Sequence, residues 1–138
     1  MPIRYTTELI SLDGFWVLFN TTGWNKEYQI SMDDLAVVIR HSRFIVAAYE
    51  GDRLVGFGRI VTDGVMHAMV YDLITDPGYQ GRGVGSEVLR RLMEKCQQAR
   101  IREIQLFCAK GKRSFYEKRD FVARPEDAPG MKYAGPVP

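Results

Sequence analysis

The segment from Asp72 to Leu89 constrains the fold of this chain more than any other. An apolar strand ends at the turn Asp76-Pro77-Gly78, the glycine-rich run at 80–85 follows, and an amphipathic helix begins at once. Glycines at alternate positions let the backbone come close to a ligand, because no Cβ atoms intervene. The first turn of a helix also presents free N–H groups and the positive end of the helix dipole. This order of elements predicts a binding site for a phosphate or pyrophosphate.

Two common phosphate motifs fail at this loop. The Walker motif needs a Gly-Lys-Ser/Thr ending, which is absent, and the dinucleotide fingerprint needs a glycine where Ser86 stands. The loop does match Gln/Arg-x-x-Gly-x-Gly/Ala and resembles the acetyl-CoA loop of the GNAT superfamily of N-acetyltransferases. A plain glycine-rich turn is the structural alternative. The resemblance implies that the pyrophosphate of acetyl-CoA is held by Gln80, Gly81, Arg82, Gly83, Val84, Gly85 and Ser86.

The periodicity of the chain predicts a single α/β domain over residues 1–138, and the resemblance implies that it is an N-acetyltransferase domain. Its order fits a mixed sheet, antiparallel in the N-terminal part, with a right-handed βαβ crossover through the long helix. The GNAT fold shows the same order, with helices on both faces of the sheet. We expect strands at 4–9, 44–50, 53–62, 66–75, 103–109, near 121 and at 130–133, and helices at 11–22, after the N-cap Ser31, at 83–100 and at 112–119.

Composition agrees with a small enzyme. The chain is 46% apolar and 26% charged with a net charge of +2, which gives no general basis for binding nucleic acid. It has neither a long apolar run nor a secretory leader, so we expect a cytoplasmic protein without membrane binding. Cys96 and Cys108 are expected as reduced, buried thiols. The spacing of the cysteines and histidines predicts no metal site.

A second resemblance lies between Leu106 and Phe121. The run that contains Tyr116 resembles the Phe-Tyr-Glu-Lys-x-Gly-Phe element after the fifth strand of many GNAT enzymes. It implies that Tyr116 lies near the thioester sulfur and protonates the leaving thiolate. A tyrosine that packs in the core is the alternative. Asp120 stands where the family usually has glycine, at the expected left-handed end of the helix.

The strand that precedes the loop is expected to face the acceptor. Family members often carry an acidic or histidine base near its middle, and here Tyr71 and Asp72 stand there, expected on opposite faces. Asp72 is the best candidate for the base, with a structural role near the turn as an equal alternative. The resemblance further implies that this strand separates from the strand at 103–109, so that pantetheine bonds to the backbone of Leu73, Ile74 and Thr75.

Short matches at other positions resemble the small serotonin-acetyltransferase-like GNAT proteins: Gly23-Trp24, Ser42, Arg59, Tyr71-Asp72 and Gly130-Met131. They suggest an arylalkylamine acceptor site lined by Phe19, Trp24, Tyr28 and Tyr71, unless these rings belong to the core. We therefore expect direct acetyl transfer from acetyl-CoA to a small primary amine, and homodimers are common in the family. A CoA-binding module without turnover and a protein lysine or N-terminal acetyltransferase are the alternatives.

Overall fold

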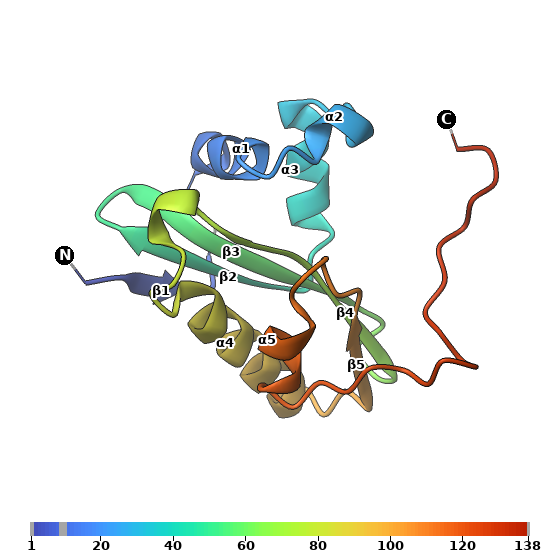
Figure 1. Cartoon of the computed structure of the whole chain (residues 1–138). Helices are drawn as coiled ribbons and strands as arrows, with labels where there is room; N and C mark the ends of the chain where they lie inside the picture. The colour runs from blue at the N-terminus through green and yellow to red at the C-terminus, as the bar shows by residue number, and fades with distance from the viewer. Residues whose placement is uncertain (1, 9–10, 138) are drawn as a thin grey trace. The chain divides into compact units, whose positions relative to one another are not determined.

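The structure, a computed structural model, describes residues 2–8 and 11–137 (Figure 1). The chain divides into two compact units, one up to Gln105 and one from Leu106 on, and each is described by itself. In chain order the elements are β1 (Arg4–Thr6), α1 (Leu12–Asn20), α2 (Asn25–Tyr28), α3 (Met32–Arg40), β2 (Phe44–Glu50), β3 (Arg53–Thr62), β4 (His67–Thr75), the 3-10 turn η1 (Pro77–Tyr79), α4 (Val84–Gln98), β5 (Glu103–Leu106) and α5 (Arg113–Glu117).

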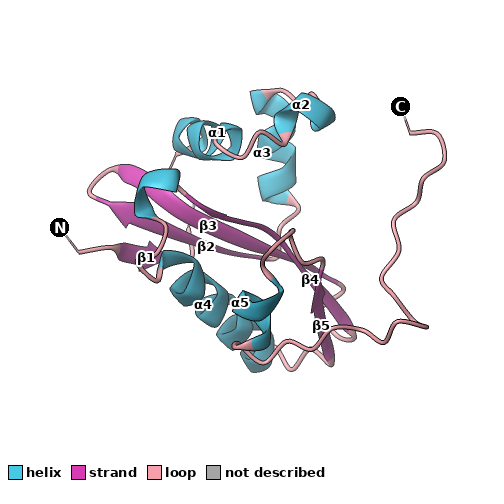
Figure 2. Cartoon of the chain, in the orientation of Figure 1, coloured by secondary structure: helices cyan, strands magenta, loops and turns pink. Residues whose placement is uncertain are grey.

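The five strands form one sheet in the order β1-β2-β3-β4-β5. The first four strands are antiparallel to their neighbours, whereas β5 runs parallel to β4 after the crossover through α4 (Figure 2). The predicted mixed α/β sheet is therefore confirmed. The crossover brings the glycine-rich loop and the start of α4 together at the carboxyl end of β4.

Helices cover both faces of this sheet (Figure 1). Phe57 of β3 packs its ring 4.1 Å from the ring of Phe15 in α1, and Leu35 of α3 joins the same buried cluster. Neighbouring residues of a strand point to opposite faces. Gly56 and Gly58, on either side of Phe57, accordingly face α4.

The two β3 glycines let α4 lie close against the sheet. A Cβ atom added at Gly56 would lie 2.5 Å from Cγ1 of Val84, and one added at Gly58 would lie 2.8 Å from Cδ1 of Leu92. Val84 and Leu92 are buried, together with Val88, Leu89 and Cys96 on the same stripe of α4. This packing fixes the first turn of α4 beside the ends of the central strands, where the predicted phosphate loop lies.

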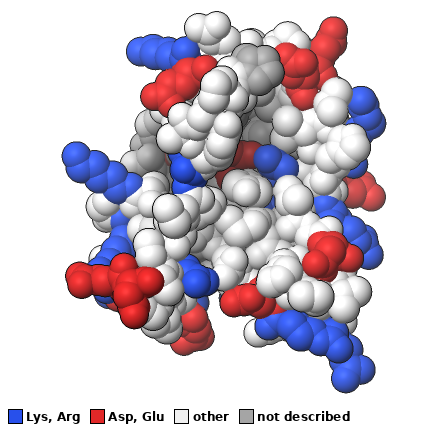
Figure 3. Space-filling view, turned by 90° about the vertical axis from the view of Figure 1, so that its right-hand side faces the viewer, with Lys and Arg blue, Asp and Glu red and all other residues white. Residues whose placement is uncertain are grey.

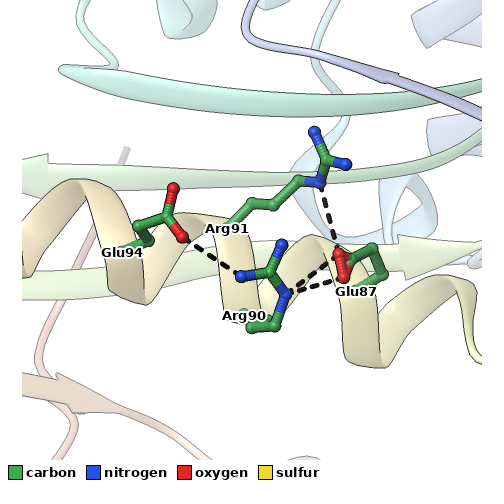
Figure 4. Close-up of polar contacts among 4 residues, drawn as sticks. All are labelled: Glu87, Arg90, Arg91 and Glu94. Atoms are coloured by element: carbon green, nitrogen blue, oxygen red, sulfur yellow. Dashed lines mark hydrogen bonds and ion pairs between the residues drawn. The ribbon is translucent and has the colours of Figure 1, made fainter.

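Charged residues cover the outer surface of α4 (Figure 4). Nε of Arg90 donates to Oε1 of Glu87 over 2.7 Å, and Nη1 of Arg90 donates to Oε2 of Glu94 over 3.1 Å. Arg91 also donates to Glu87 and lies 4.8 Å from the ring centre of Tyr5 in β1. Glu87 is in the first turn of α4, where a carboxylate would repel a phosphate. Its pairing with two arginines offsets that charge.

Local capping was predicted correctly. Ser31 accepts a hydrogen bond from the backbone N–H of Asp34, and the Asp34 carboxylate accepts one from the backbone N–H of Ser31. This reciprocal pair is the capping box expected at the start of α3. Ser11 similarly accepts a hydrogen bond from Gly14 N–H and caps α1.

Several predicted elements were longer than those observed. The strand predicted at 4–9 spans Arg4–Thr6, with residue 9 outside the described residues, and the strand predicted at 103–109 ends at Leu106. Cys108 therefore lies outside the sheet and is exposed, so its predicted burial was wrong, whereas Cys96 is buried as expected. The chain instead turns before α5, where Lys112 N–H donates to Ala109 C=O over 3.0 Å.

The last two predicted strands were wrong. Residues near 121 and at 130–133 form no strand. Pro125 and Pro129 lack an N–H and restrict the residues before them, which disfavours a strand ladder here. A turn forms instead, with Ala128 N–H donating to Pro125 C=O over 2.9 Å.

Candidate functional site

The glycine-rich loop leaves the N-terminus of α4 open. Gly81 and Gly83 have φ angles of 78° and 80°, and Gly83 is the N-cap of α4. Apart from the neighbouring residues in the chain, a Cβ atom added at either glycine would have no atom of the described residues within 4 Å. Whereas Ser11 and Ser31 cap α1 and α3, no side chain of the described residues caps α4. The backbone N–H groups of Val84 and Gly85 in the first turn are thus available to an external acceptor.

The turn before the loop is held by a buried carboxylate. Asp76 is 7% exposed, and its Oδ1 accepts a hydrogen bond from Gly78 N–H over 2.8 Å. Its Oδ2 accepts one from Nη2 of Arg53 over 2.9 Å, and its own N–H donates to Val55 C=O. These bonds tie the turn to the start of β3 and fix where the loop begins.

The predicted loop residues differ in what they expose. Gln80, Gly81, Arg82 and Gly83 are exposed, whereas Gly85 and Ser86 are half-buried. Val84 is 1% exposed and packs beneath the loop toward Gly56. Val84 can therefore offer a ligand its backbone N–H but not its side chain. Each of these positions stays a predicted contact for the pyrophosphate.

The strand β4 contains a bulge at the predicted acceptor position. Phe57 pairs with Ile74 and Arg59 pairs with Tyr71, so β4 uses one residue more than β3 over this span. Asp72 lies in the bulge with a φ of 54°, a conformation that aspartate tolerates better than most residues. The bulge breaks the strict alternation that the sequence suggests.

As a result, Tyr71 and Asp72 both reach the guanidinium of Arg59, so the expectation of opposite faces was wrong. Nε of Arg59 donates to Oδ2 of Asp72 over 2.6 Å, and the guanidinium lies 5.3 Å from the ring centre of Tyr71. Nη1 of Arg59 also donates to Oγ of Ser42 over 3.4 Å. The ion pair is largely shielded, since the side chains of Arg59 and Asp72 are 15% and 20% exposed.

The far half of β4 extends past β5. Glu103 N–H donates to Met66 C=O over 2.8 Å, and this parallel register takes β5 along the first half of β4 only. Leu73, Ile74 and Thr75 lie in the other half, where β4 still pairs with β3. Their edge of β4 thus has no strand partner among the described residues.

The four predicted acceptor aromatics do not form one cluster. Phe19 is 3% exposed and belongs to the core, so its predicted place in the acceptor site was wrong. Trp24 and Tyr28 lie at α2 and are exposed, and the Trp24 ring contacts Phe19 edge-on at 6.4 Å. Tyr71 is exposed and contacts Arg59 instead. Three aromatic side chains therefore remain candidates for acceptor contact.

In the second unit, α5 positions Tyr116. Its ring lies edge-on to those of Phe115 and Phe121, at 5.1 and 5.8 Å. Phe121 N–H donates to Tyr116 C=O over 3.1 Å, and Asp120 has a φ of 68°, as predicted for the left-handed helix end. Burial raises the pKa of the Tyr116 hydroxyl, with a smaller contribution from Cys108. The hydroxyl therefore keeps its proton at neutral pH, as a general acid must.

On the face drawn in Figure 3, basic and acidic side chains are interspersed, and neither sign forms a continuous area. Across residues 2–8 and 11–137, no group of three or more His, Cys, Asp or Glu could hold a metal ion. No helix in these ranges is long and apolar enough to cross a membrane.

The sequence motifs did not indicate the contacts that Arg59 and Tyr79 make. Each side chain donates a hydrogen bond to a residue distant in sequence, Arg59 to Asp72 and Tyr79 to Glu50. The appearance of Arg59 in the subgroup resemblance and the position of Tyr79 beside the loop were the available signals.

Comparison with known proteins decides the family. Residues 10–121 match the family model described as the acetyltransferase (GNAT) family. The chain belongs to this family. It is therefore an N-acetyltransferase, and GNAT enzymes generally take the acetyl group from acetyl-CoA.

Among its relatives is an uncharacterized N-acetyltransferase of Porphyra purpurea, 31% identical over 91% of this chain and 72% of that protein. The GCN5-related N-acetyltransferase 1, chloroplastic, of Arabidopsis thaliana is 31% identical over 95% of this chain and 66% of that protein. A histone acetyltransferase of Glycine max is 29% identical over 83% and 53%. This chain thus spans only part of each relative.

A solved structure supports the same conclusion. The GNAT family acetyltransferase of Streptococcus pneumoniae has a TM-score of 0.79 and is 26% identical. The match covers 97% of this chain and 98% of that one. The observed order of helices and strands is therefore that of a known GNAT fold, and it differs from the predicted order by the additional short helix α2 and the two absent C-terminal strands.

Proposed function

We propose that this chain transfers an acetyl group from acetyl-CoA to a small primary amine, with an arylalkylamine as the best-suited acceptor. The observation that carries the proposal is the uncapped N-terminus of α4 behind Gly81 and Gly83. Exposed backbone N–H groups at a helix start bind phosphate groups well. Arg82 adds a fixed positive charge in the same loop.

The residues of the chain divide the reaction between them. Loop N–H groups bind the pyrophosphate, and the backbone of Leu73–Thr75 binds pantetheine along the strand edge that β5 leaves unpaired. The acceptor nitrogen attacks the acetyl carbonyl, so that a C–N bond forms and the C–S bond breaks. Tyr116 gives its hydroxyl proton to the departing thiolate. Burial raises the pKa of the Tyr116 hydroxyl, so the hydroxyl carries the proton to be donated at neutral pH.

Asp72 is proposed as the group that takes the proton from the acceptor amine, directly or through a water. Its carboxylate already accepts a hydrogen bond from Arg59, which fixes its position. A carboxylate has two oxygens, and only Oδ2 is engaged with Arg59 among the described residues. Oδ1 can therefore serve the acceptor while the ion pair stays intact.

Aromatic exposure favours a flat, apolar amine as acceptor. Trp24 and Tyr71 are each 37% exposed, and Tyr28 is 66% exposed. Aromatic walls with a few polar groups are typical of small-molecule sites. We assign these three side chains to acceptor binding.

A protein lysine is the second candidate acceptor, because the Glycine max relative is named a histone acetyltransferase. Lysine-rich peptides are best held by an extended acidic surface. On the face drawn in Figure 3, acidic and basic side chains are mixed, and no extended acidic area is seen there.

A panel of amines tests the proposal. Tryptamine, phenethylamine, spermidine and a histone peptide are each incubated with acetyl-CoA, and the released CoA thiol is measured. We expect the arylalkylamines to have the highest kcat/KM. A panel in which the peptide or spermidine reacts fastest would overturn the acceptor assignment, and a panel without any turnover would favour a CoA-binding module.

A further inference from the structure

Two arginines meet one aromatic ring beside the phosphate loop. The guanidinium of Arg82 lies 4.9 Å from the ring centre of Tyr79, and that of Arg53 lies 5.5 Å from it. Tyr79 ends η1, two residues before the first left-handed glycine of the loop. Arg53 begins β3, so it reaches the ring from a different part of the chain.

The hairpin between β2 and β3 holds this ring in place. The Tyr79 hydroxyl donates to Oε1 of Glu50, the last residue of β2, over 2.7 Å. Glu50 pairs with Arg53 in the sheet, so the two sheet residues that contact Tyr79 both come from the hairpin end. The hydrogen bond to Glu50 raises the pKa of Tyr79, with burial as a smaller cause. The hydroxyl therefore remains a donor at neutral pH.

Of the two arginines at the Tyr79 ring, Arg82 is the one without an ion-pair partner among the described residues. Arg53 forms an ion pair with Asp76, and Glu50 accepts the Tyr79 hydroxyl. Arg82 is exposed and, among the described residues, has the Tyr79 ring as its contact and no hydrogen bond or ion pair. Its N–H donors are thus free, while the ring restricts where the guanidinium can go.

We infer that Tyr79 is a positioning residue, which the hairpin residues Glu50 and Arg53 hold so that its ring presents Arg82 to the phosphates of acyl-CoA. The inference rests on the proposed acetyl-CoA site. An exposed arginine samples many rotamers and loses that freedom when it binds a phosphate. A ring that already confines the guanidinium lowers this loss, which is the effect of preorganisation.

Affinity for CoA separates this role from a structural one. Dissociation constants are measured by isothermal titration calorimetry for the wild type and the variants Tyr79→Leu, Tyr79→Phe and Arg82→Ala, and for the double variant. Tyr79→Leu should weaken CoA binding by roughly 2–5-fold, the size of an exposed cation–π contact. Tyr79→Phe keeps the ring and should stay closer to the wild type than Tyr79→Leu.

The decisive result is the coupling between the two residues. If Tyr79 acts through Arg82, the Tyr79→Leu substitution should have no further effect once Arg82 is alanine. In turnover assays Tyr79→Leu should raise KM for acetyl-CoA and leave kcat unchanged. Additive losses in the double variant, or an equal loss in Tyr79→Phe, would overturn the inference.

A matched control comes from the edge strand β1. Arg91 lies 4.8 Å from the ring centre of Tyr5, a contact of the same kind that includes no residue of the loop at 80–85. Tyr5→Leu should leave the CoA dissociation constant unchanged, and a loss there equal to that of Tyr79→Leu would overturn the inference. A wild-type protein that does not bind CoA refutes the proposed function itself, whereas binding without coupling refutes only the role of Tyr79.

Discussion

Replacement of Gly83 by valine separates ligand binding from folding. Gly83 has a φ of 80°, and an L side chain in the left-handed region costs about 1–2 kcal/mol. Space adds no further cost, because a Cβ atom there meets no other protein atom within 4 Å. For a chain of 138 residues, 1 kcal/mol shifts Tm by about 3–5 °C. We therefore expect the unliganded variant to melt about 3–10 °C below the wild type.

The effect on ligand binding should be much larger. A ligand at about 100 times its Kd stabilises the folded state by about 2.7 kcal/mol, or about 8–13 °C for this chain. In Gly83→Val, either the side chain fills the space in front of the loop amides or the backbone leaves the left-handed region. Both changes remove the phosphate site, so the acetyl-CoA shift seen by differential scanning fluorimetry should disappear.

Gly64 provides the matched control. It has a φ of 82°, lies in the β3–β4 turn, and an added Cβ atom would likewise meet nothing within 4 Å. Gly64→Val should lower the unliganded Tm to a similar extent and keep the full acetyl-CoA shift. A shift that survives in Gly83→Val, or that is lost equally in Gly64→Val, would refute the assignment of the loop.

Tyr116→Phe should lower kcat by roughly 10²–10⁴ in steady-state assays with nearly unchanged acetyl-CoA affinity, because it removes the acid and keeps the ring; an unchanged kcat would return Tyr116 to a packing role. Trp24→Ala should raise KM for an arylalkylamine more than it lowers kcat, and equal kinetics would argue against acceptor contact. Gly58→Val should destabilise the fold by about 1–3 kcal/mol in urea unfolding, because its Cβ would lie 2.8 Å from Leu92 Cδ1; wild-type stability would contradict the close packing of α4. Hydrogen bonds from Arg90, and to a smaller extent from Arg91, lower the pKa of Glu87 below its ordinary value of 4.5. The Glu87 carboxylate therefore stabilises the folded state fully above pH 4.5, and this contribution to the free energy of unfolding is lost as the pH falls through the folded-state pKa. Glu87→Gln should thus be less stable than the wild type at pH 7 by about 0.5–1 kcal/mol, and a difference that persists in acid would contradict this origin.

The parts of the fold set by local chemistry were predictable from the sequence. Ser31 and Asp34 are three residues apart and cap each other whatever the rest of the fold does. The glycine-rich loop and the left-handed Asp120 also follow from residues close in sequence. The hairpin of β2 and β3 was marked by Gly51-Asp52 between two apolar runs.

What could not be predicted depends on partners far along the chain. The bulge at Asp72 arises from the register between β3 and β4, and Arg59, 13 positions away, donates a hydrogen bond to the Asp72 carboxylate. Tyr79 and Glu50 are 29 positions apart. The helix α2 has four residues, too few for an apolar period to show. The length of β5 likewise depends on how many of its residues can pair with β4, which is distant in sequence.

The central claim is that the open N-terminus of α4 serves acetyl transfer to an amine. Its most direct test follows one reaction of acetyl-CoA with tryptamine and quantifies free CoA and N-acetyltryptamine together by mass spectrometry. We expect equal amounts of both products with the wild type and neither above background with Gly83→Val. Release of CoA without acetylated tryptamine or any other acetylated amine, or undiminished product with Gly83→Val, would contradict it.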